Sequence, residues 1–159
     1  MSLSNIREQI KVILAGVPGI GVVHDYDRLA VDFSKMLDLF KDSDGRINTV
    51  MFRREKLEQR SATIGGAPHE KAHIFKLKAV MGLRDAEGSG IVFDDLLQAI
   101  VDEFEDYPDL NGACLTTTTD WGSMAGQAGI QIELAEDRMF GNVLCHYAEL
   151  RLCALEYET

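Results

Sequence analysis

The segment HIFKLKAVM, residues 73–81, alternates apolar with polar or basic side chains, and it is the stretch that decides the fold. Successive side chains of an extended chain point to opposite faces, so this spacing predicts a strand with one covered and one solvated face. The covered face would carry Phe75, Leu77, Ala79 and Met81. Lys76 and Lys78 would then form a basic, solvated face that can meet a partner.

Further strands are predicted on both sides of this segment. Residues 47–54 predict a partner strand, and the polar, glycine-containing residues 61–70 between the two predict a long hairpin or arm. The other candidates are the short β-branched run 20–24 and the segments 113–118, 130–134 and 142–157. The last is longer than a typical strand of about five or six residues, so we expect it to bend or to protrude from the domain.

Apolar residues at helical spacing predict a strong helix that begins at Ser89, as its cap, and ends before Pro108. Its apolar stripe consists of Phe93, Leu96, Leu97, Ile100, Val101 and Phe104. The acidic residues between these positions indicate a solvated opposite face. We expect the stripe to cover the sheet.

Two more helices are predicted nearer the start of the sequence. Residues 5–15 show helical spacing, with Asn5 and Glu8 placed as a capping pair. Residues 29–40 carry a second apolar face. Residues 1–3 lack the basic flank and the long apolar stretch of a secretory signal and resemble an added remnant, so the fold prediction leaves them out.

The composition is that of a single globular domain. The 159 residues are 46% hydrophobic and 26% charged, without a linker or an internal repeat, and no apolar run approaches the ~20 residues of a membrane-spanning helix. We therefore expect one α+β domain over residues 1–159, with a mainly antiparallel sheet and helices packed on one face. The net charge of −10 disfavours diffuse binding to nucleic acid.

Residue types that carry catalysis or bind metals are scattered. The cysteines Cys114, Cys145 and Cys153 are odd in number and lack C-x-x-C spacing, so we expect small buried residues and neither disulfides nor zinc. The glycines around Pro18 fit turns better than a phosphate cradle. The histidines are His24, His69, His73 and His146. We expect no catalytic constellation, no cofactor and no metal site.

Two other functions remain open. One is a ligand-binding or enzymatic site built from dispersed residues such as His24, His73, Asp85 and Glu149. The other is a nucleic-acid interface built from the basic cluster Arg53, Arg54, Lys56 and Arg60, which the acidic balance weakens.

Three motifs resemble a family of tail proteins found in Mu-like prophages. They are Val23-His24-Asp25-Tyr26, Arg46-Ile47-Asn48 and Phe140-Gly141-Asn142-Val143-Leu144-Cys145-His146-Tyr147-Ala148-Glu149-Leu150. The resemblance implies a protein similar to the tail terminators of long-tailed bacteriophages. Those proteins are not enzymes and have an α+β fold. They form a hexameric ring between the tail tube and the head-completion proteins, through which DNA passes. The implied locations are the bacterial cytoplasm during assembly and then the virion tail, without a membrane.

We expect the subunits of such a ring to meet through the long strands and the polar arm, since exposed strand edges are ready to pair. The interface residues predicted on this basis are Arg54, Lys56, Glu58, Arg60 and Trp121. Trp121 is included because an exposed aromatic residue near a loop can anchor an interface. Residues 121–129, rich in glycine, are predicted to be a mobile loop.

Overall fold

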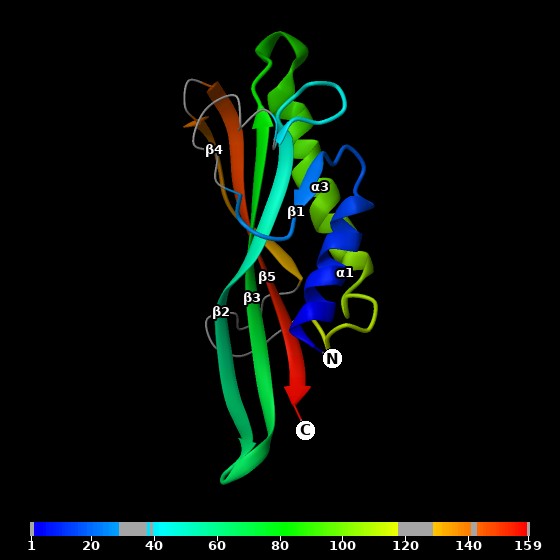
Figure 1. Cartoon of the computed structure of the whole chain (residues 1–159), viewed down its shortest axis with the longest axis vertical. Helices are drawn as coiled ribbons and strands as arrows, with labels where there is room; N and C mark the ends of the chain where they lie inside the picture. Colours follow the sequence, from blue (N-terminus) through cyan, green and yellow to red (C-terminus); the bar gives the residue numbers. More distant parts are fainter. Residues whose placement is uncertain (1, 29–37, 39, 118–128, 141–142, 159) are drawn as a thin grey trace.

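Five strands form one sheet in the computed structural model, which describes residues 2–28, 38, 40–117, 129–140 and 143–158. They are β1 (Val22–His24), β2 (Asn48–Thr63), β3 (Gly66–Gly82), β4 (Ile130–Phe140) and β5 (Val143–Glu158). Their order across the sheet is β1-β2-β3-β5-β4 (Figure 1). β1 is parallel to β2, and the other neighbouring pairs are antiparallel. The α+β class and the mainly antiparallel sheet are therefore confirmed.

β2 and β3 form one long hairpin, and its outer half extends beyond the helices together with the end of β5 (Figure 1). We call residues 54–75 and 152–158 the arm. A two-residue turn, Ile64-Gly65, joins β2 to β3, and Gly65 has a φ of +100°, which glycine adopts without strain. The predicted arm is confirmed, but residues 61–70 are mostly strand. Their sequence shows no alternation because side chains near the tip have little apolar surface to cover them.

β5 is an interior strand of the sheet and lies between β3 and β4. It pairs with β3 from the body into the arm, so the prediction of one long, protruding strand is confirmed. β4 pairs with β5 only as far as Leu152, and beyond that row an isolated bridge joins Leu155 to Thr116.

Two strand predictions needed correction. β4 continues to Phe140, beyond the predicted end at residue 134, because its second half is largely exposed and shows no apolar alternation. Residues 113–117 form no strand, and residue 118 lies outside the described residues. The chain turns before that segment at Leu110 and Asn111, both of which have positive φ. The N–H of Thr117 then donates to Pro108 O at 2.7 Å, which folds the segment back.

The first helix, α1 (Leu3–Ala15), begins earlier than predicted. The hydroxyl of Ser2 is the cap, and it accepts the N–H of Asn5 at 3.2 Å. Asn5 is therefore a first-turn residue, and residues 2 and 3, which the fold prediction left out, form the start of the helix.

α3 (Ser89–Asp106) follows a 3-10 turn, η1 (Asp85–Glu87). Gly88, with φ +66°, occupies the cap position, and the Ser89 hydroxyl makes no cap bond, so the predicted Ser89 cap is wrong. Of the helix predicted at residues 29–40, positions 29–37 and 39 lie outside the described residues.

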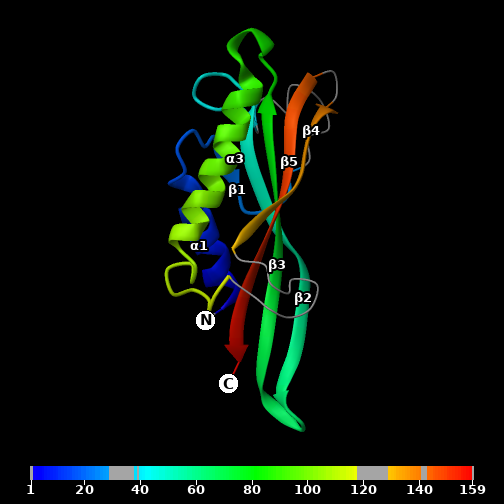
Figure 2. The same ribbon diagram turned by 180° about the vertical axis from the view of Figure 1, so that it is seen from behind.

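Both helices pack on one face of the sheet (Figure 2). The predicted stripe of α3 is buried there except for half-buried Val101, and it meets the apolar face of β3 as expected. The core also takes in the buried face of α1, formed by Ile6, Ile10, Ile13 and Leu14. A smaller cluster lies on the opposite face and consists of Phe40, Ile47, Met51, Val80, Cys145 and Tyr147.

Candidate functional site

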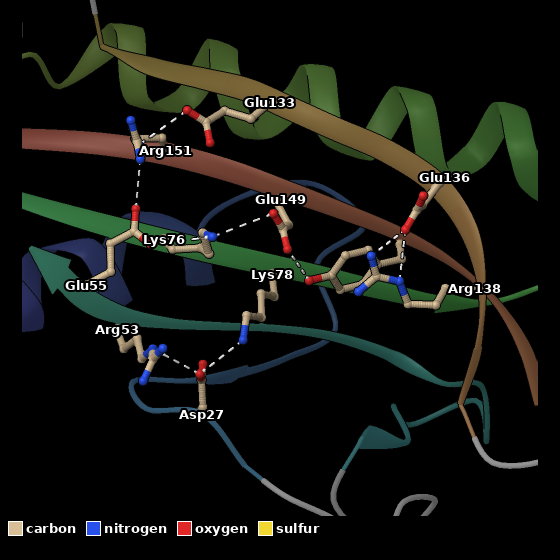
Figure 3. Close-up of polar contacts among 11 residues, drawn as sticks. Asp27, Arg53, Glu55, Lys76, Lys78, Glu133, Glu136, Arg138, Glu149 and Arg151 are labelled. Carbon is tan, nitrogen blue, oxygen red and sulfur yellow. Dashed lines mark hydrogen bonds and ion pairs between the residues drawn. The ribbon is translucent and has the colours of Figure 1, made fainter. Parts of the chain in front are cut away.

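The sheet face opposite the helices carries a network of ion pairs, which we call the ion-pair lattice (Figure 3). Its cations are Arg53, Lys76, Lys78, Arg138 and Arg151, and its carboxylates are Asp27, Glu55, Glu133, Glu136 and Glu149. Cations and carboxylates are equal in number, so the face is charge-balanced. The predicted basic face of β3 is therefore neutralised within the chain.

Glu55 links three strands at the centre of the lattice. It lies 3.4 Å from Lys76 Nζ on β3 and 3.1 Å from Arg151 Nη2 on β5. Lys76 also lies 3.7 Å from Glu149, and Arg151 lies 3.2 Å from Glu133 on β4. These side chains are partly shielded from water, and networks of several such charges hold geometry better than isolated surface pairs.

Asp27 extends the lattice to the segment after β1. Its Oδ2 lies 3.2 Å from Arg53 Nε and 3.1 Å from Lys78 Nζ, so one carboxylate fixes this segment against β2 and β3.

Tyr147 and Glu149 connect the lattice to β4. The Tyr147 hydroxyl donates to Glu149 Oε1 at 2.8 Å, and the Arg138 guanidinium stacks 4.0 Å from the centre of the Tyr147 ring. The hydrogen bond from Tyr147 lowers the pKa of Glu149, with help from Lys76. Burial, followed by the bond to Glu149, raises the pKa of Tyr147. The pair therefore keeps one proton on the phenol and none on the carboxylate at neutral pH.

The arm has its own polar contacts on each face. On the lattice side, Glu70 accepts from Arg60 and, at 2.7 Å, from the hydroxyl of Tyr157, which ties β2, β3 and β5 together. The bond from Arg60, followed by that from Tyr157, lowers the pKa of Glu70. Lys56 pairs with Glu58 on the same face.

The helix-side face of the arm carries a second cross-strand row. Arg54 Nη1 lies 3.2 Å from His73 Nδ1, and His73 Nε2 lies 3.1 Å from Glu156 Oε1. His73 and Glu156 are buried, so this row belongs to the interior of the arm.

The structure places four of the five predicted interface residues on the arm. A register shift between Arg54 and Lys56 puts Arg54 on the helix side and Lys56, Glu58 and Arg60 on the lattice side. Trp121 lies outside the described residues, as does the predicted loop apart from Gly129. The four arm residues thus share a segment but not a face.

The basic cluster proposed for nucleic acid is dispersed in the same way. Arg53 pairs with Asp27 on the lattice side, while Arg54 contacts His73 on the other face. The other two members, Lys56 and Arg60, also have carboxylate partners. The cluster presents no continuous unpaired basic surface to a phosphate backbone.

The dispersed set of His24, His73, Asp85 and Glu149 is not gathered into one site. His24 and Glu149 lie in one row of the sheet but three strands apart, roughly 14 Å at about 4.8 Å per strand. His73 lies in the arm, and Asp85 begins η1. His146 and Glu149 face opposite sides of β5, as predicted from their spacing.

Ser89, His146 and Asp137 form a cluster that no sequence pattern predicted. Ser89 Oγ lies 2.9 Å from His146 Nε2, and His146 Nδ1 lies 2.7 Å from Asp137 Oδ1. These spacings match those of a nucleophile, a base and an orienting carboxylate. However, Ser89 is only 1% exposed, and its hydroxyl accepts the N–H of Arg84 at 2.8 Å. The cluster therefore joins α3, β4, β5 and the segment before η1.

A pocket of about 430 Å³ lies beside this cluster. It is lined by Gly90, Ile91, Phe93, Asp94, Ala135, Glu136, Asp137 and His146. The Phe93 ring stacks on His146 with 5.5 Å between centroids. Ser89 is not among the lining residues, so the hydroxyl lies behind the imidazole. The packing of α3 against β4 and β5 creates this site, and no local sequence motif signals it.

The three cysteines are buried and free, as predicted. Burial raises the pKa of Cys114 to about 12 and those of Cys145 and Cys153 to about 11. They remain protonated at neutral pH and are poor nucleophiles.

Within the described residues, no group of three or more His, Cys, Asp or Glu side chains is arranged to hold a metal ion. No helix in the same part of the chain is long and apolar enough to cross a membrane. Comparison of the sequence with models of known protein families and with curated proteins finds no match.

Proposed function

We propose that this chain is a structural subunit of a phage or prophage tail, a ring-forming tail terminator or tail completion protein at the head-tail junction. The arm is the observation that supports this most. β2, β3 and β5 extend together beyond the helices, and no strand of the described chain pairs with the outer side of β2 beyond Met51. A long edge of this kind is a template for another chain. The three motifs that resemble Mu-like prophage tail proteins suggest the assembly.

The partners follow from this role. Six copies would close into a ring, with the tail tube on one side and head-completion proteins on the other. The net charge of −10 per copy suits a passage for DNA, because repulsion keeps the polymer from adhering to the wall. The subunit would work without a cofactor, in the bacterial cytoplasm during assembly and then in the virion tail.

Deleting residues 58–68 tests the proposal. Residues 69–72 would then connect Leu57 to His73, its partner in the hairpin, so the remaining strands can close. We expect a folded monomer by circular dichroism and sedimentation, whereas the full chain forms a ring-sized particle. Ile64→Ser is the matched control, since it changes the exposed turn but leaves both strands intact.

Two results would count against the proposal. An oligomer that survives the deletion would show that the arm is not the assembly element. A full chain that stays monomeric, even with the tube protein encoded by a neighbouring gene, would refute the ring itself.

The geometry of Ser89, His146 and Asp137 favours a second candidate, a hydrolytic site beside the pocket. This candidate ranks below the first because the nucleophile is buried and its oxygen already accepts a backbone N–H. A fluorophosphonate probe distinguishes the two functions, because it reacts only with an activated, accessible serine. Labelling of Ser89 that disappears in His146→Ala would favour the hydrolase, and absence of labelling would favour the structural role.

A further inference from the structure

Within the part of the chain that the structure describes, the sheet has two edges without a neighbouring strand, and their net charges are opposite. The outer side of β2 over residues 52–63 has no strand partner among the described residues, and β4 is the edge strand on the other side. Residues 52–63 contain four Lys or Arg and two Glu, a net charge of +2. β4 contains three carboxylates and one Arg, a net charge of −2. The basic edge therefore differs in sign from the chain as a whole, whose net charge is −10.

The two edges also match in length. β4 has 11 residues, and the open part of β2 has 12. At about 3.4 Å per residue, each edge is roughly 40 Å long. Edges of equal length can pair along their whole extent.

We propose that the open edge of β2 pairs with β4 of a second copy, head to tail. This inference rests on the proposed function and names the contact that would build the ring. β2 and β5 run in one direction, and β3 and β4 run in the other. A neighbour placed by rotation around a ring keeps the direction of its strands. The new pair, β4 of one copy and β2 of the next, is therefore antiparallel.

The pairing requires neighbours to be displaced along the strands. Arg54 and Ile130 lie in one row of the sheet, through Phe75 and Leu152. The open edge of β2 starts near that row and extends toward the tip of the arm. β4 starts in the same row and extends toward the opposite end of the sheet. The arm of one copy therefore reaches alongside the body of the next. Closed sheets accommodate such a stagger by tilting their strands relative to the axis.

Charge also selects the head-to-tail arrangement over a symmetric dimer. Pairing β2 with β2, or β4 with β4, would bring together two edges with the same sign of net charge. The charges are paired within the chain but remain in contact with solvent: Lys56 pairs with Glu58 and Asp137 with His146, and the side chains of Lys56 and Asp137 are 55% and 56% exposed. Opposite edges therefore attract, whereas identical edges repel.

A charge-swap cycle tests the contact. Lys56→Glu with Arg60→Glu changes the β2 edge to −2, and Glu133→Lys with Glu136→Lys changes β4 to +2. Each double variant has two like-charged edges, so we expect its association constant by sedimentation to fall at least tenfold. The quadruple variant has opposite edges again and should recover to within about threefold of the unmodified chain. Circular dichroism checks that each variant folds.

Hydrogen exchange of the unmodified chain gives a second readout that does not depend on variants. Amides of residues 130–140 and 52–63 should exchange more slowly in the oligomer than after dilution to monomer. Two results would refute the edge contact in a chain that does assemble. One is a quadruple variant whose association constant is as low as those of the double variants, and the other is unchanged amide exchange in β4. Either result would leave the proposed ring itself intact. If the unmodified chain never assembles, the proposed function fails with it.

Discussion

Replacing Ile100 with alanine tests the packing of α3 on the sheet. Ile100 is fully buried in the core between the helices and the sheet. The change removes three carbons, each worth about 0.8 kcal/mol when buried, and leaves a cavity that neighbours fill only in part. We expect the free energy of unfolding to fall by about 3–4 kcal/mol, inside the ~2–5 kcal/mol range typical of this substitution.

Ile91→Ala is the matched control, because Ile91 lies on the same helix but is 71% exposed. It should change the free energy of unfolding by no more than about 0.5 kcal/mol. Urea titrations at one protein concentration, followed by circular dichroism, measure both variants. For a domain of this size, the expected loss in Ile100→Ala lowers Tm by about 6–16 °C. Equal stability of the two variants would refute the assignment of the stripe.

The other predictions concern Glu70 in the arm, Gly21 just before β1, and the buried thiol of Cys153. The pKa of Glu70 is lower in the folded than in the unfolded protein, so its contribution to stability is complete above the ordinary value of 4.5 and is lost as pH falls through the lower folded value. In Glu70→Gln, the free energy of unfolding measured by urea titration should therefore fall less steeply as the pH decreases below 4.5. An unchanged pH dependence would exclude this role for Glu70. Gly21→Ala should destabilise by about 1–3 kcal/mol because its Cβ would meet Asn48 O at 2.0 Å, whereas Gly90→Ala, with room for a Cβ, should not destabilise. Cys153 should resist iodoacetamide in the folded protein at pH 8 and react in urea, and rapid native labelling would contradict its burial.

Sequence periodicity predicted the elements whose two faces differ. β3 alternates because helices cover one face and the ion-pair lattice covers the other, and the stripe of α3 is the complement of that covered face. The second half of β4 and the tip of the arm lack this contrast. Most of their described side chains are exposed, and the buried one, Glu70, is polar, so no apolar pattern marks them as strands.

The sequence could not predict on which face of the arm its charged residues lie. Strict alternation along β2 would place Lys56, Glu58 and Arg60 on the same face of the sheet as Arg54. The bulge after Arg54 adds one residue to β2 and moves the three later side chains to the opposite face. A bulge depends on the partner strand, so the arm was predicted but its faces were not.

The Ser89 cluster could not be predicted for a related reason. Ser89 and His146 are 57 positions apart, and only the packing of α3 on β5 brings them together. Asp137 joins them through the register of β4 on β5. The local sequence around Ser89 predicted a helix cap instead, and Gly88 takes that position.

The position of β5 between β3 and β4 matters for biosynthesis. A ribosome makes β3 well before β5, and until then β3 has one unpaired edge next to an apolar surface, which is an aggregation hazard. The charges of Lys76 and Lys78 interrupt the apolar sequence of β3 and oppose its aggregation until β5 has been synthesised. β4 gains its partner β5, its one strand neighbour among the described residues, at the same moment. A nascent chain interrupted before β5 would therefore be a substrate for chaperones and proteases, not a partly working subunit.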